Sequence, residues 1–133
     1  MRIAVIGNNE WQNKRKIQQV LTDLKQRFGN ELIIIGAGGS EGANHMIRKF
    51  TLEFGIQYKE YNASYTGYNL YSALPESYYG KKYHFSQLLH RMKILSENCD
   101  CLVIMNNEES LNPQLKTAYN KINKLKKPVT IIG

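Results

Sequence analysis

A glycine-rich segment carries the clearest chemical signal in this sequence. Four glycines fall within the seven residues from Gly36 to Gly42, after an apolar run and before a segment with helical spacing. Glycine adopts backbone conformations that other residues avoid, so its N–H groups can approach a ligand closely. A helix that begins after such a loop adds free N–H groups and a dipole that favours a phosphate. The segment predicts a phosphate-binding loop, with a plain tight turn as the alternative.

Two other polar loops are expected to lie beside this one. They follow the first and fourth apolar runs and cover residues 7–11 and 106–110. In an open α/β sheet, ligands bind beyond the carboxyl ends of the strands, where the strand order reverses. We therefore expect these ligand-binding residues in the three loops: Gly7, Asn8, Asn9, Trp11, Gly36, Gly38, Gly39, Ser40, Gly42, Asn106 and Asn107.

Short apolar runs alternate with helical segments along the chain. Four of the five runs are continuously apolar, as in parallel strands buried on both faces. The expected strands are Ile3–Ile6, Leu32–Ile35, Ile56–Tyr58, Leu102–Met105 and Val129–Ile132, and the expected helices cover about 17–28, 43–54, 85–98 and 113–126. This order predicts an α/β fold, a three-layer Rossmann-like sandwich with a five-stranded, mainly parallel sheet. The usual strand order would be 3-2-1-4-5.

The composition fits one domain. The 133 residues are 42% hydrophobic, contain no low-complexity run, and predict a single domain over residues 1–133. No apolar stretch is long enough to span a membrane, and Met1 leads straight into an apolar run without the pattern of a secretory signal. We expect a cytoplasmic protein with no membrane partner.

A tyrosine-rich insertion interrupts the regular pattern at residues 61–83. It contains seven of the nine tyrosines, mixed with asparagine, serine and threonine. Connections of this length are often functional. One interpretation is a lid over the ligand, with Tyr65 and Tyr68 in contact with it. The other is packed structure, because Tyr61, Tyr65 and Tyr68 have the spacing of a short extra helix.

The cysteines and histidines do not indicate a metal site or a disulfide. Cys99 and Cys101 stand two apart beside a predicted strand, which would point both side chains to the same side. Their spacing suits neither a disulfide framework nor a structural zinc site, so we expect reduced packing residues. His45, His84 and His90 have no compact metal-binding spacing. We predict no metal and no cofactor.

The stretch from Ile35 to Asn44 resembles the Gly-Gly-x-x-Gly-Ala-Asp signature of the SLOG superfamily. This Rossmann-like group includes the LOG cytokinin-activating phosphoribohydrolases and the DNA-processing protein DprA. The YspA-like branch is closest in pattern: its Gly-Ser-Arg-x-aromatic turn is similar to residues 7–11. Its Arg-Asn pair, at the start of the helix before the fourth strand, falls at His90-Arg91-Met92. The resemblance implies ligand contacts at Ala43 and Asn44 and a phosphate clamp at Arg91. A helix-surface salt bridge is the alternative for Arg91.

Three departures bear on catalysis. The family's arginine after the first strand is Asn9, its aspartate after Gly-Ala is Asn44, and the Pro-Gly-Gly-x-Gly-Thr loop of the LOG enzymes is replaced by residues 106–112. Hydrolysis of an N-glycosidic bond needs a group that activates water, usually a carboxylate. The acids expected near the cleft are Glu41, Glu108 and Glu109, for which a solvated loop position is the alternative.

The expected partner is a nucleotide or nucleotide-derived small molecule, bound through the phosphate loop, with N-glycosidic hydrolysis as the candidate reaction. Eighteen basic and eleven acidic residues give a net charge of +7, which suits an anionic partner. The alternatives are a DprA-like protein that binds single-stranded nucleic acid and a non-catalytic sequestering or regulatory module. The expected sheet order places the two lysine-rich clusters, 14–16 and 121–127, on opposite faces, so a continuous basic groove would require a homo-oligomer, which we expect.

Overall fold

Five parallel strands form one sheet in the computed structural model, which describes residues 1–133. The strands are β1 (Arg2–Gly7), β2 (Ile33–Gly36), β3 (Gln57–Glu60), β4 (Cys101–Met105) and β5 (Val129–Ile132). Their order is β3-β2-β1-β4-β5, and every neighbouring pair is parallel. The predicted Rossmann-like α/β fold and its strand order are confirmed, and the sheet is parallel throughout.

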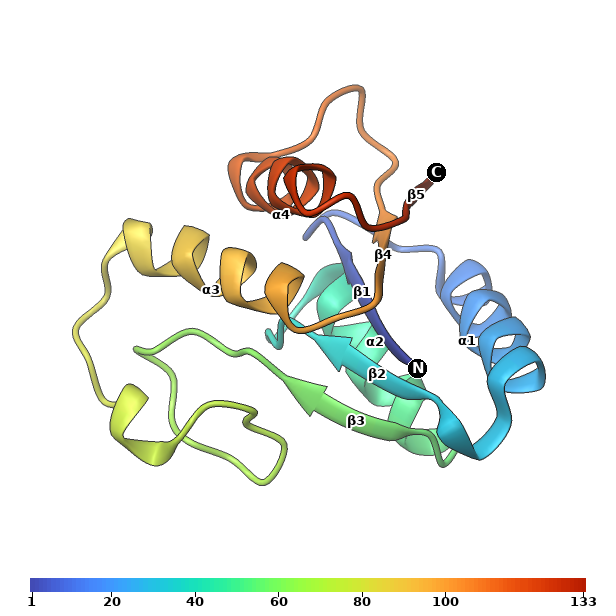
Figure 1. Cartoon of the computed structure of the whole chain (residues 1–133), viewed down its shortest axis with the longest axis horizontal. Helices are drawn as coiled ribbons and strands as arrows, with labels where there is room; N and C mark the ends of the chain where they lie inside the picture. The colour runs from blue at the N-terminus through green and yellow to red at the C-terminus, as the bar shows by residue number, and fades with distance from the viewer.

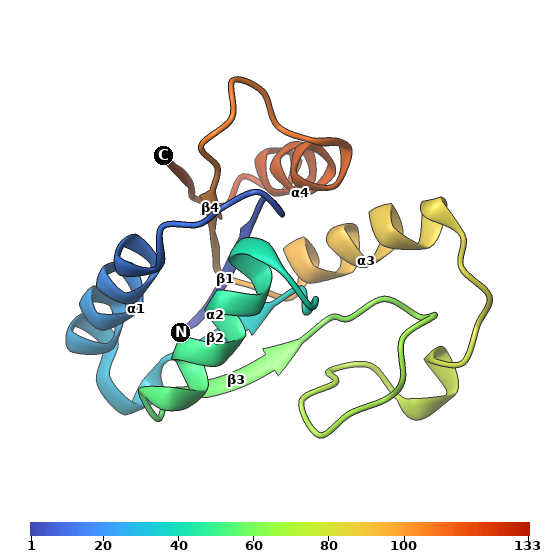
Figure 2. The ribbon, with the colours of Figure 1, turned by 180° about the vertical axis from the view of Figure 1, so that it is seen from behind.

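Helices cover both faces of the sheet (Figures 1 and 2). α1 (Lys14–Phe28) and α2 (Gly42–Glu53) pack on one face, and α3 (Phe85–Glu97) and α4 (Pro113–Lys124) pack on the other. Right-handed crossovers on either side of β1 lead to this division, because the chain first moves outward from β1 through β2 to β3 and then returns to β4. Two short 3-10 turns, η1 (Gly29–Glu31) and η2 (Glu76–Tyr78), complete the regular structure.

Side-chain caps mark where three of the helices begin. At the start of α3, His84 Nδ1 accepts a hydrogen bond from the Ser86 N–H at 3.2 Å. Asn13 Oδ1 accepts a hydrogen bond from the Lys16 N–H at 3.1 Å, and Asn112 Oδ1 accepts one from the Leu115 N–H at 2.9 Å. These bonds satisfy N–H groups that have no acceptor within the helix. By contrast, α2 begins after Glu41, whose side chain makes no capping bond. The N-terminus of α2 is therefore not closed by a side chain of its own.

The hydrophobic core has two halves, one on each face of β1. Ile3 and Val5 point toward α1 and α2, whereas Ala4 and Ile6 point toward α3 and α4. All four side chains are almost completely buried. A strand that is buried on both faces has a continuous apolar sequence. For this reason the apolar run Ile3–Ile6 predicted a central parallel strand.

The register of the strands brings the polar loops to one edge of the sheet. Gly7 pairs with Met105, and Gly36 pairs with Glu60. The segments that follow β1, β2, β3 and β4 therefore start side by side. A Cβ on Gly7 would overlap Ala43 and the backbone of Met105, so glycine at this position allows α2 to approach the ends of β1 and β4.

The tyrosine-rich segment continues the sheet edge beside β3 and contains no helix at residues 61–68. The Glu60 N–H donates to the Tyr71 carbonyl, and the Ala73 N–H donates to the Glu60 carbonyl, both at 2.9 Å. These bonds form a parallel bridge between Glu60 and Ser72. The segment therefore packs against the edge of β3 as irregular structure, and the extra-helix interpretation of the tyrosine spacing is wrong.

The two cysteines are free thiols that face opposite sides of the sheet. Cys99 is buried with the residues packed under α3 and α4, whereas Cys101 packs on the side of α1. The prediction that both point to the same side is wrong because β4 begins at Cys101, so Cys99 precedes the extended segment. Burial raises the pKa of the Cys99 thiol to about 11.

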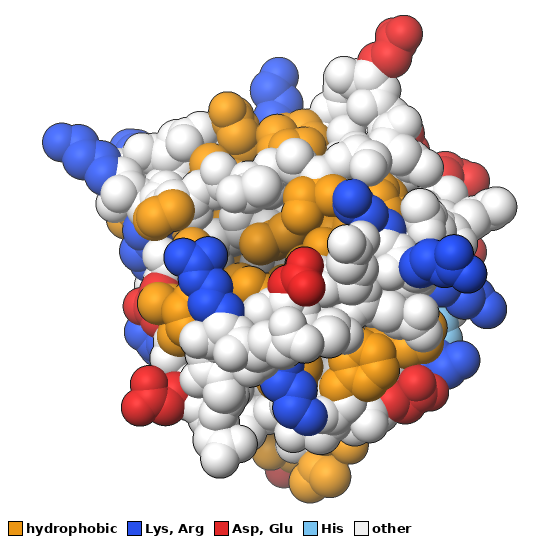
Figure 3. All heavy atoms as spheres, turned by 90° about the vertical axis from the view of Figure 1, so that its right-hand side faces the viewer, with side chains coloured by type: hydrophobic (Ala, Val, Ile, Leu, Met, Phe, Trp, Pro, Cys, Tyr) orange, Lys and Arg blue, Asp and Glu red, His pale blue; other side chains and the backbone are white.

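Charged side chains are dispersed over the surface. The cluster at Lys14–Lys16 lies on α1, and the cluster at 121–127 lies on and after α4, on the other face of the sheet. On the side that carries α1 and the C-terminal strand, lysine and arginine side chains are separated by hydrophobic and uncharged ones (Figure 3). None of the helices combines the length and apolar character needed to cross a membrane.

Candidate functional site

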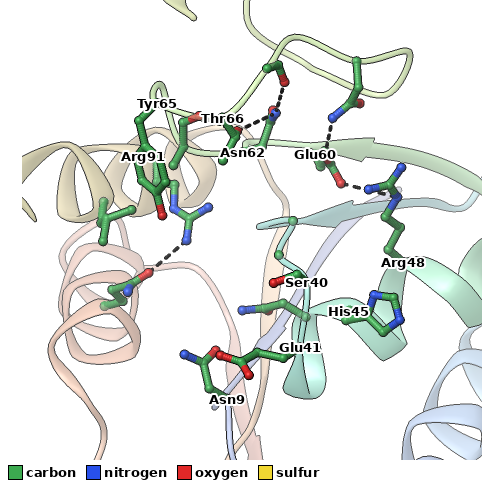
Figure 4. Close-up of a pocket in the computed structure, with 18 residues that line it drawn as sticks. Asn9, Ser40, Glu41, His45, Arg48, Glu60, Asn62, Tyr65, Thr66 and Arg91 are labelled. Atoms are coloured by element: carbon green, nitrogen blue, oxygen red, sulfur yellow. Dashed lines mark hydrogen bonds and ion pairs between the residues drawn. The ribbon is translucent and has the colours of Figure 1, made fainter. Parts of the chain in front are cut away.

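A cavity of about 660 Å³, called the pocket below, opens at the carboxyl end of the sheet. It lies between the start of α2, the end of β3, the tyrosine-rich segment and α3 (Figure 4). Polar side chains and glycines form most of its wall. The lining residues are Asn9, Gly38, Gly39, Ser40, Glu41, Asn44, His45, Arg48, Glu60, Asn62, Ala63, Tyr65, Thr66, Gly67, Asn69, Leu88, Arg91 and Gln114.

The glycine-rich loop forms one wall of the pocket. Gly38 has φ +70° and Gly42 has φ +69°, in the left-handed region that glycine adopts without steric cost. A Cβ on Gly42 would overlap the backbone of Asn9. Glycine at position 42 therefore lets α2 begin directly against the loop that follows β1, and the loop from Gly38 to Glu41 is left to face the pocket.

Arg91 is a buried cation without an acidic partner. It comes from the middle of α3, and only 8% of its surface is exposed. One guanidinium nitrogen, Nη1, donates to the Ala37 carbonyl at 2.5 Å, and Nη2 donates to Gln114 Oε1 at 2.9 Å. Its Nε is buried without a hydrogen-bond partner, and no carboxylate forms an ion pair with it. The salt-bridge alternative for Arg91 is therefore wrong.

Burial has an electrostatic effect on Arg91. Removal from water lowers the pKa of its guanidinium from the ordinary value, and the neighbouring tyrosines and Glu60 act in the opposite direction. Arginine stays protonated in proteins, so the positive charge persists in a site with little solvation. An isolated buried charge is costly unless an opposite charge accompanies it. This end of the pocket therefore favours an anion.

Glu60, at the end of β3, is the second buried charged group of the pocket. It is 1% exposed. Its Oε1 accepts a hydrogen bond from Tyr58 Oη at 2.9 Å, and its Oε2 accepts one from Asn69 Nδ2 at 2.8 Å. Burial and the adjacent carboxylate raise the pKa of Tyr58, so its hydroxyl stays protonated and donates. Unlike Arg91, Glu60 has a side chain of opposite charge within ion-pair distance.

Arg48 links α2 to this carboxylate. Its Nε lies 3.9 Å from Glu60 Oε1, and its guanidinium carbon lies 5.4 Å from the centre of the Tyr71 ring. Arg48 is partly exposed, so the pair is only partly removed from water. Its cation offsets the negative charge of Glu60, whereas no carboxylate lies within ion-pair distance of Arg91.

Asn62 holds the tyrosine-rich segment in place at the top of the pocket. Its Nδ2 donates to Thr66 Oγ1 and to the Gly67 carbonyl, both at 3.2 Å. Its Oδ1 accepts from Tyr79 Oη at 2.5 Å and from Ser72 Oγ at 3.1 Å. The part of the segment that is left free to contact a ligand includes the half-exposed ring of Tyr65, which lines the pocket and packs edge-on against Tyr83.

Eight of the predicted site residues come together in the pocket. They come from the loops after β1 and β2, from the start of α2, from the tyrosine-rich segment and from α3: Asn9, Gly38, Gly39, Ser40, Glu41, Asn44, Tyr65 and Arg91. The family pattern places its arginine at the start of a helix, whereas Arg91 lies near the middle of α3.

The other predicted residues lie outside the pocket lining, for reasons of packing. Trp11 is 2% exposed in the core, and its Nε1 donates to the Asn13 carbonyl at 2.8 Å. Tyr68 packs edge-on against Tyr79. Gly7, Gly36, Gly42 and Ala43 serve close packing around α2 and the strand ends instead of facing the pocket.

The loop after β4 also lies apart from the pocket lining. Asn8 is buried, and its Nδ2 donates to Asn107 Oδ1 and to Glu108 Oε1, both at 3.0 Å. This contact ties the loop to the end of β1. Asn106, Asn107, Glu108 and Glu109 are therefore not brought to the pocket wall.

Sequence reasoning missed Arg48, Glu60 and Asn62. Arg48 lies four residues after Asn44 on α2, so helical spacing could have placed both on one face. Glu60 and Tyr58 lie on the same buried face of β3, a signal that was lost because the predicted strand ended at Tyr58. Asn62 belongs to an irregular segment whose folding has no local signature.

Solved structures with this fold differ widely from the chain in sequence. The molybdenum cofactor carrier protein MCP from Chlamydomonas reinhardtii is similar over 98% of this chain and 74% of its own, with 19% identity and a TM-score of 0.66. The X-ray structure of TM1055, a structural genomics target, is similar over 96% of this chain and 71% of its own, with 15% identity and a TM-score of 0.63. No family model and no curated protein matches the chain. The chain thus shares its Rossmann-like α/β fold with these proteins.

Proposed function

We propose that the pocket binds a phosphorylated, nucleotide-like small molecule, with its phosphate between Arg91 and the loop from Gly38 to Glu41. The observation that carries this proposal is the burial of Arg91 without a carboxylate partner. A phosphate would supply the missing negative charge and would accept a hydrogen bond from the unpartnered Nε. An arginine–phosphate contact of this kind is among the stronger charge-assisted hydrogen bonds.

The opposite wall supports the same placement. The loop leads into α2, a helix of 12 residues that has no side-chain cap. The N–H groups and dipole of such a helix start stabilise a phosphate. Glu41, at the same helix start, would oppose the anion unless its carboxylate turned toward solvent, and it is exposed. The anion therefore belongs nearer Arg91 than Glu41.

The remaining wall suits a polar heterocycle or sugar. Amide side chains at Asn9 and Gln114 line the pocket together with the half-exposed ring of Tyr65. Amides can pair with the edge of a base, and an aromatic ring can stack on its face. The volume of the pocket, about 660 Å³, falls in the range of small-molecule sites. The name of the carrier protein from Chlamydomonas supports small-molecule binding by this fold.

Ligand titration tests the proposal directly. Thermal-shift and calorimetric measurements with inorganic phosphate, ribose 5-phosphate and nucleoside 5′-monophosphates should find a compound that binds the native chain. Arg91→Gln should weaken that binding at least tenfold, because loss of a charged hydrogen bond costs about 1.5–3 kcal/mol. Lys93→Gln is the matched control, since it removes an exposed positive charge from the same helix. Equal affinity in both variants would contradict the proposed phosphate position.

Hydrolysis of an N-glycosidic bond is a second candidate function. It is favoured by Glu41, which lines the pocket and has no hydrogen bond or ion pair within the chain. A free carboxylate is the group that water activation requires. Incubation with nucleoside monophosphates should then release free base, and Glu41→Gln should abolish release while ligand binding persists. Binding without release would favour the sequestering or carrier role.

Nucleic acid is the less favoured partner. The lysine-rich clusters at 14–16 and 121–127 lie on different faces of the sheet, so a single chain offers no continuous basic path between them. Any binding of an oligonucleotide should therefore be weak and should collapse as salt rises, because it reflects counterion release. Tight binding that persists at physiological salt would favour the DprA-like alternative, or a homo-oligomer that joins the clusters.

A further inference from the structure

Glu60 is the buried carboxylate of the chain, and its acceptor capacity is not used up by its partners. Tyr58 Oη supplies one hydrogen bond to Oε1, and Asn69 Nδ2 supplies one to Oε2. A carboxylate oxygen can accept two. Arg48 Nε lies 3.9 Å from Oε1, beyond hydrogen-bond distance. One acceptor position on Oε2 is therefore left unfilled in a side chain that borders the pocket.

Gly38 lies beside this oxygen in the wall of the pocket. A Cβ at position 38 would lie 3.2 Å from Glu60 Oε2 and 3.1 Å from Asn62 Cβ. Contacts of that length are tighter than ordinary packing. A side chain at position 38 would therefore press against Oε2. Glycine avoids this and leaves Glu60 in the lining of the pocket, with only 1% of its surface exposed.

The charge around Glu60 restricts the kind of group it can bind. Arg48 Nε lies 3.9 Å from Oε1 and offsets the negative charge. A cationic group on a ligand would meet the repulsion of Arg48 and gain little. A neutral hydrogen-bond donor avoids that repulsion and still satisfies the free acceptor position on Oε2. A hydroxyl group has this chemistry.

We propose that Glu60 accepts a hydrogen bond from a sugar hydroxyl of the ligand, and that it thereby selects hydroxylated sugar phosphates over their deoxy counterparts. The inference rests on the proposed function, because it takes the phosphate at Arg91 as its starting point. Arg91 and Glu60 lie on different walls of the pocket (Figure 4). One ligand can therefore present its phosphate to the first and its sugar to the second.

Base-free sugar phosphates provide the test on the native chain. Calorimetric affinities should be compared for ribose 5-phosphate, 2-deoxyribose 5-phosphate and 3-deoxyribose 5-phosphate. At least one deoxy compound should bind about tenfold more weakly, the effect of one hydrogen bond to a charged acceptor. Equal affinities for all three would overturn the assignment of Glu60 and leave the phosphate site intact. Failure of all three and of inorganic phosphate to bind would instead overturn the proposed function.

Variants then identify the residue responsible. Glu60→Gln should reduce the preference for ribose 5-phosphate to less than about twofold, while the affinity for inorganic phosphate stays unchanged. Tyr58 is not part of the pocket lining, and Tyr58→Phe removes only its hydrogen bond to Glu60 Oε1. This variant should keep the preference for ribose 5-phosphate. A preference that persists in folded Glu60→Gln protein would contradict the proposal. If that variant does not fold, the comparison of the three sugars on the native chain decides.

Discussion

Asn44 and Gly7 form a two-way hydrogen-bonded pair at the junction of α2 and β1. The Gly7 N–H donates to Asn44 Oδ1 at 3.1 Å, and Asn44 Nδ2 donates to the Gly7 carbonyl at 3.2 Å. Both residues are buried. The pair needs a side chain that donates and accepts at once, which an amide does and an ionised carboxylate does not. This gives a physical reason for asparagine where the family pattern has aspartate.

Replacing this amide should destabilise the fold. Asn44→Asp keeps the shape but places a carboxylate against the Gly7 carbonyl without a donor. We expect a loss of about 1–3 kcal/mol in the free energy of unfolding, measured by urea denaturation near pH 7. The loss should be smaller at low pH, where the protonated carboxyl of the variant can donate a hydrogen bond to the Gly7 carbonyl. An unchanged free energy of unfolding at neutral pH would mean that the pair contributes nothing.

Gly42 and Gly55 form a matched pair for a steric prediction. Both have φ +69°, but a Cβ on Gly42 would overlap the backbone of Asn9, whereas a Cβ on Gly55 would meet nothing within 4 Å. Gly55→Ala should cost about 1–2 kcal/mol, the strain of the left-handed conformation. Gly42→Ala should cost about 1–3 kcal/mol more, because the backbone must shift. Similar chemical denaturation midpoints for the two variants would refute the steric argument.

Tyr79 should stabilise the tyrosine-rich segment through its hydroxyl. Tyr79 Oη donates to the buried Asn62 Oδ1, whereas Tyr83 is 59% exposed. Tyr79→Phe should lower the free energy of unfolding by about 1 kcal/mol, and Tyr83→Phe should change it little. Thermal denaturation of both variants checks this. Equal melting temperatures would indicate that the segment is held by other contacts.

The same segment should show two levels of mobility. The amides of Ala73 and Tyr79 donate to backbone carbonyls, and we expect slow hydrogen exchange there without ligand. The amides of Tyr65 and Gly67, near the pocket mouth, have no such backbone bond and should exchange fast until a ligand binds. Exchange followed by mass spectrometry on short peptides separates the two groups. Uniformly fast exchange over 62–80 would favour a lid that moves as a whole.

Tyr58 should make the protein sensitive to alkali. Burial, then the neighbouring Glu60, raises the pKa of its hydroxyl above the ordinary value of 10.0. The folded chain therefore keeps this proton after the unfolded chain has lost it. The contribution of Tyr58 to the free energy of unfolding is complete below pH 10 and declines as the pH rises further. The decline approaches about 1.4 kcal/mol per pH unit for one group. Tyr58→Phe should flatten the pH dependence of unfolding measured between about pH 9 and 11, and parallel profiles would contradict the prediction.

The sequence was sufficient to predict the sheet, the helices and the side of the sheet where the pocket lies. Continuous apolar runs such as Ile3–Ile6 indicate strands buried on both faces, and the alternation of strands and helices restricts the topology. The glycines at 38 and 39 indicated the loop that lines the pocket. These signals are local, because each depends on the spacing and type of residues that are close together in the chain.

The composition of the pocket was decided by tertiary packing. Trp11 follows pocket residue Asn9 by two positions, but its large apolar ring is more stable in the core than in a polar cavity. Tertiary folding alone brings Glu60, Asn62 and Arg91 into one pocket, because it places the end of β3 opposite α3. Glu60 and Arg91 are 31 residues apart in the chain. Whether Arg91 pairs with an acid or stays unpaired depends on which side chains surround it after folding, and no local pattern encodes that arrangement.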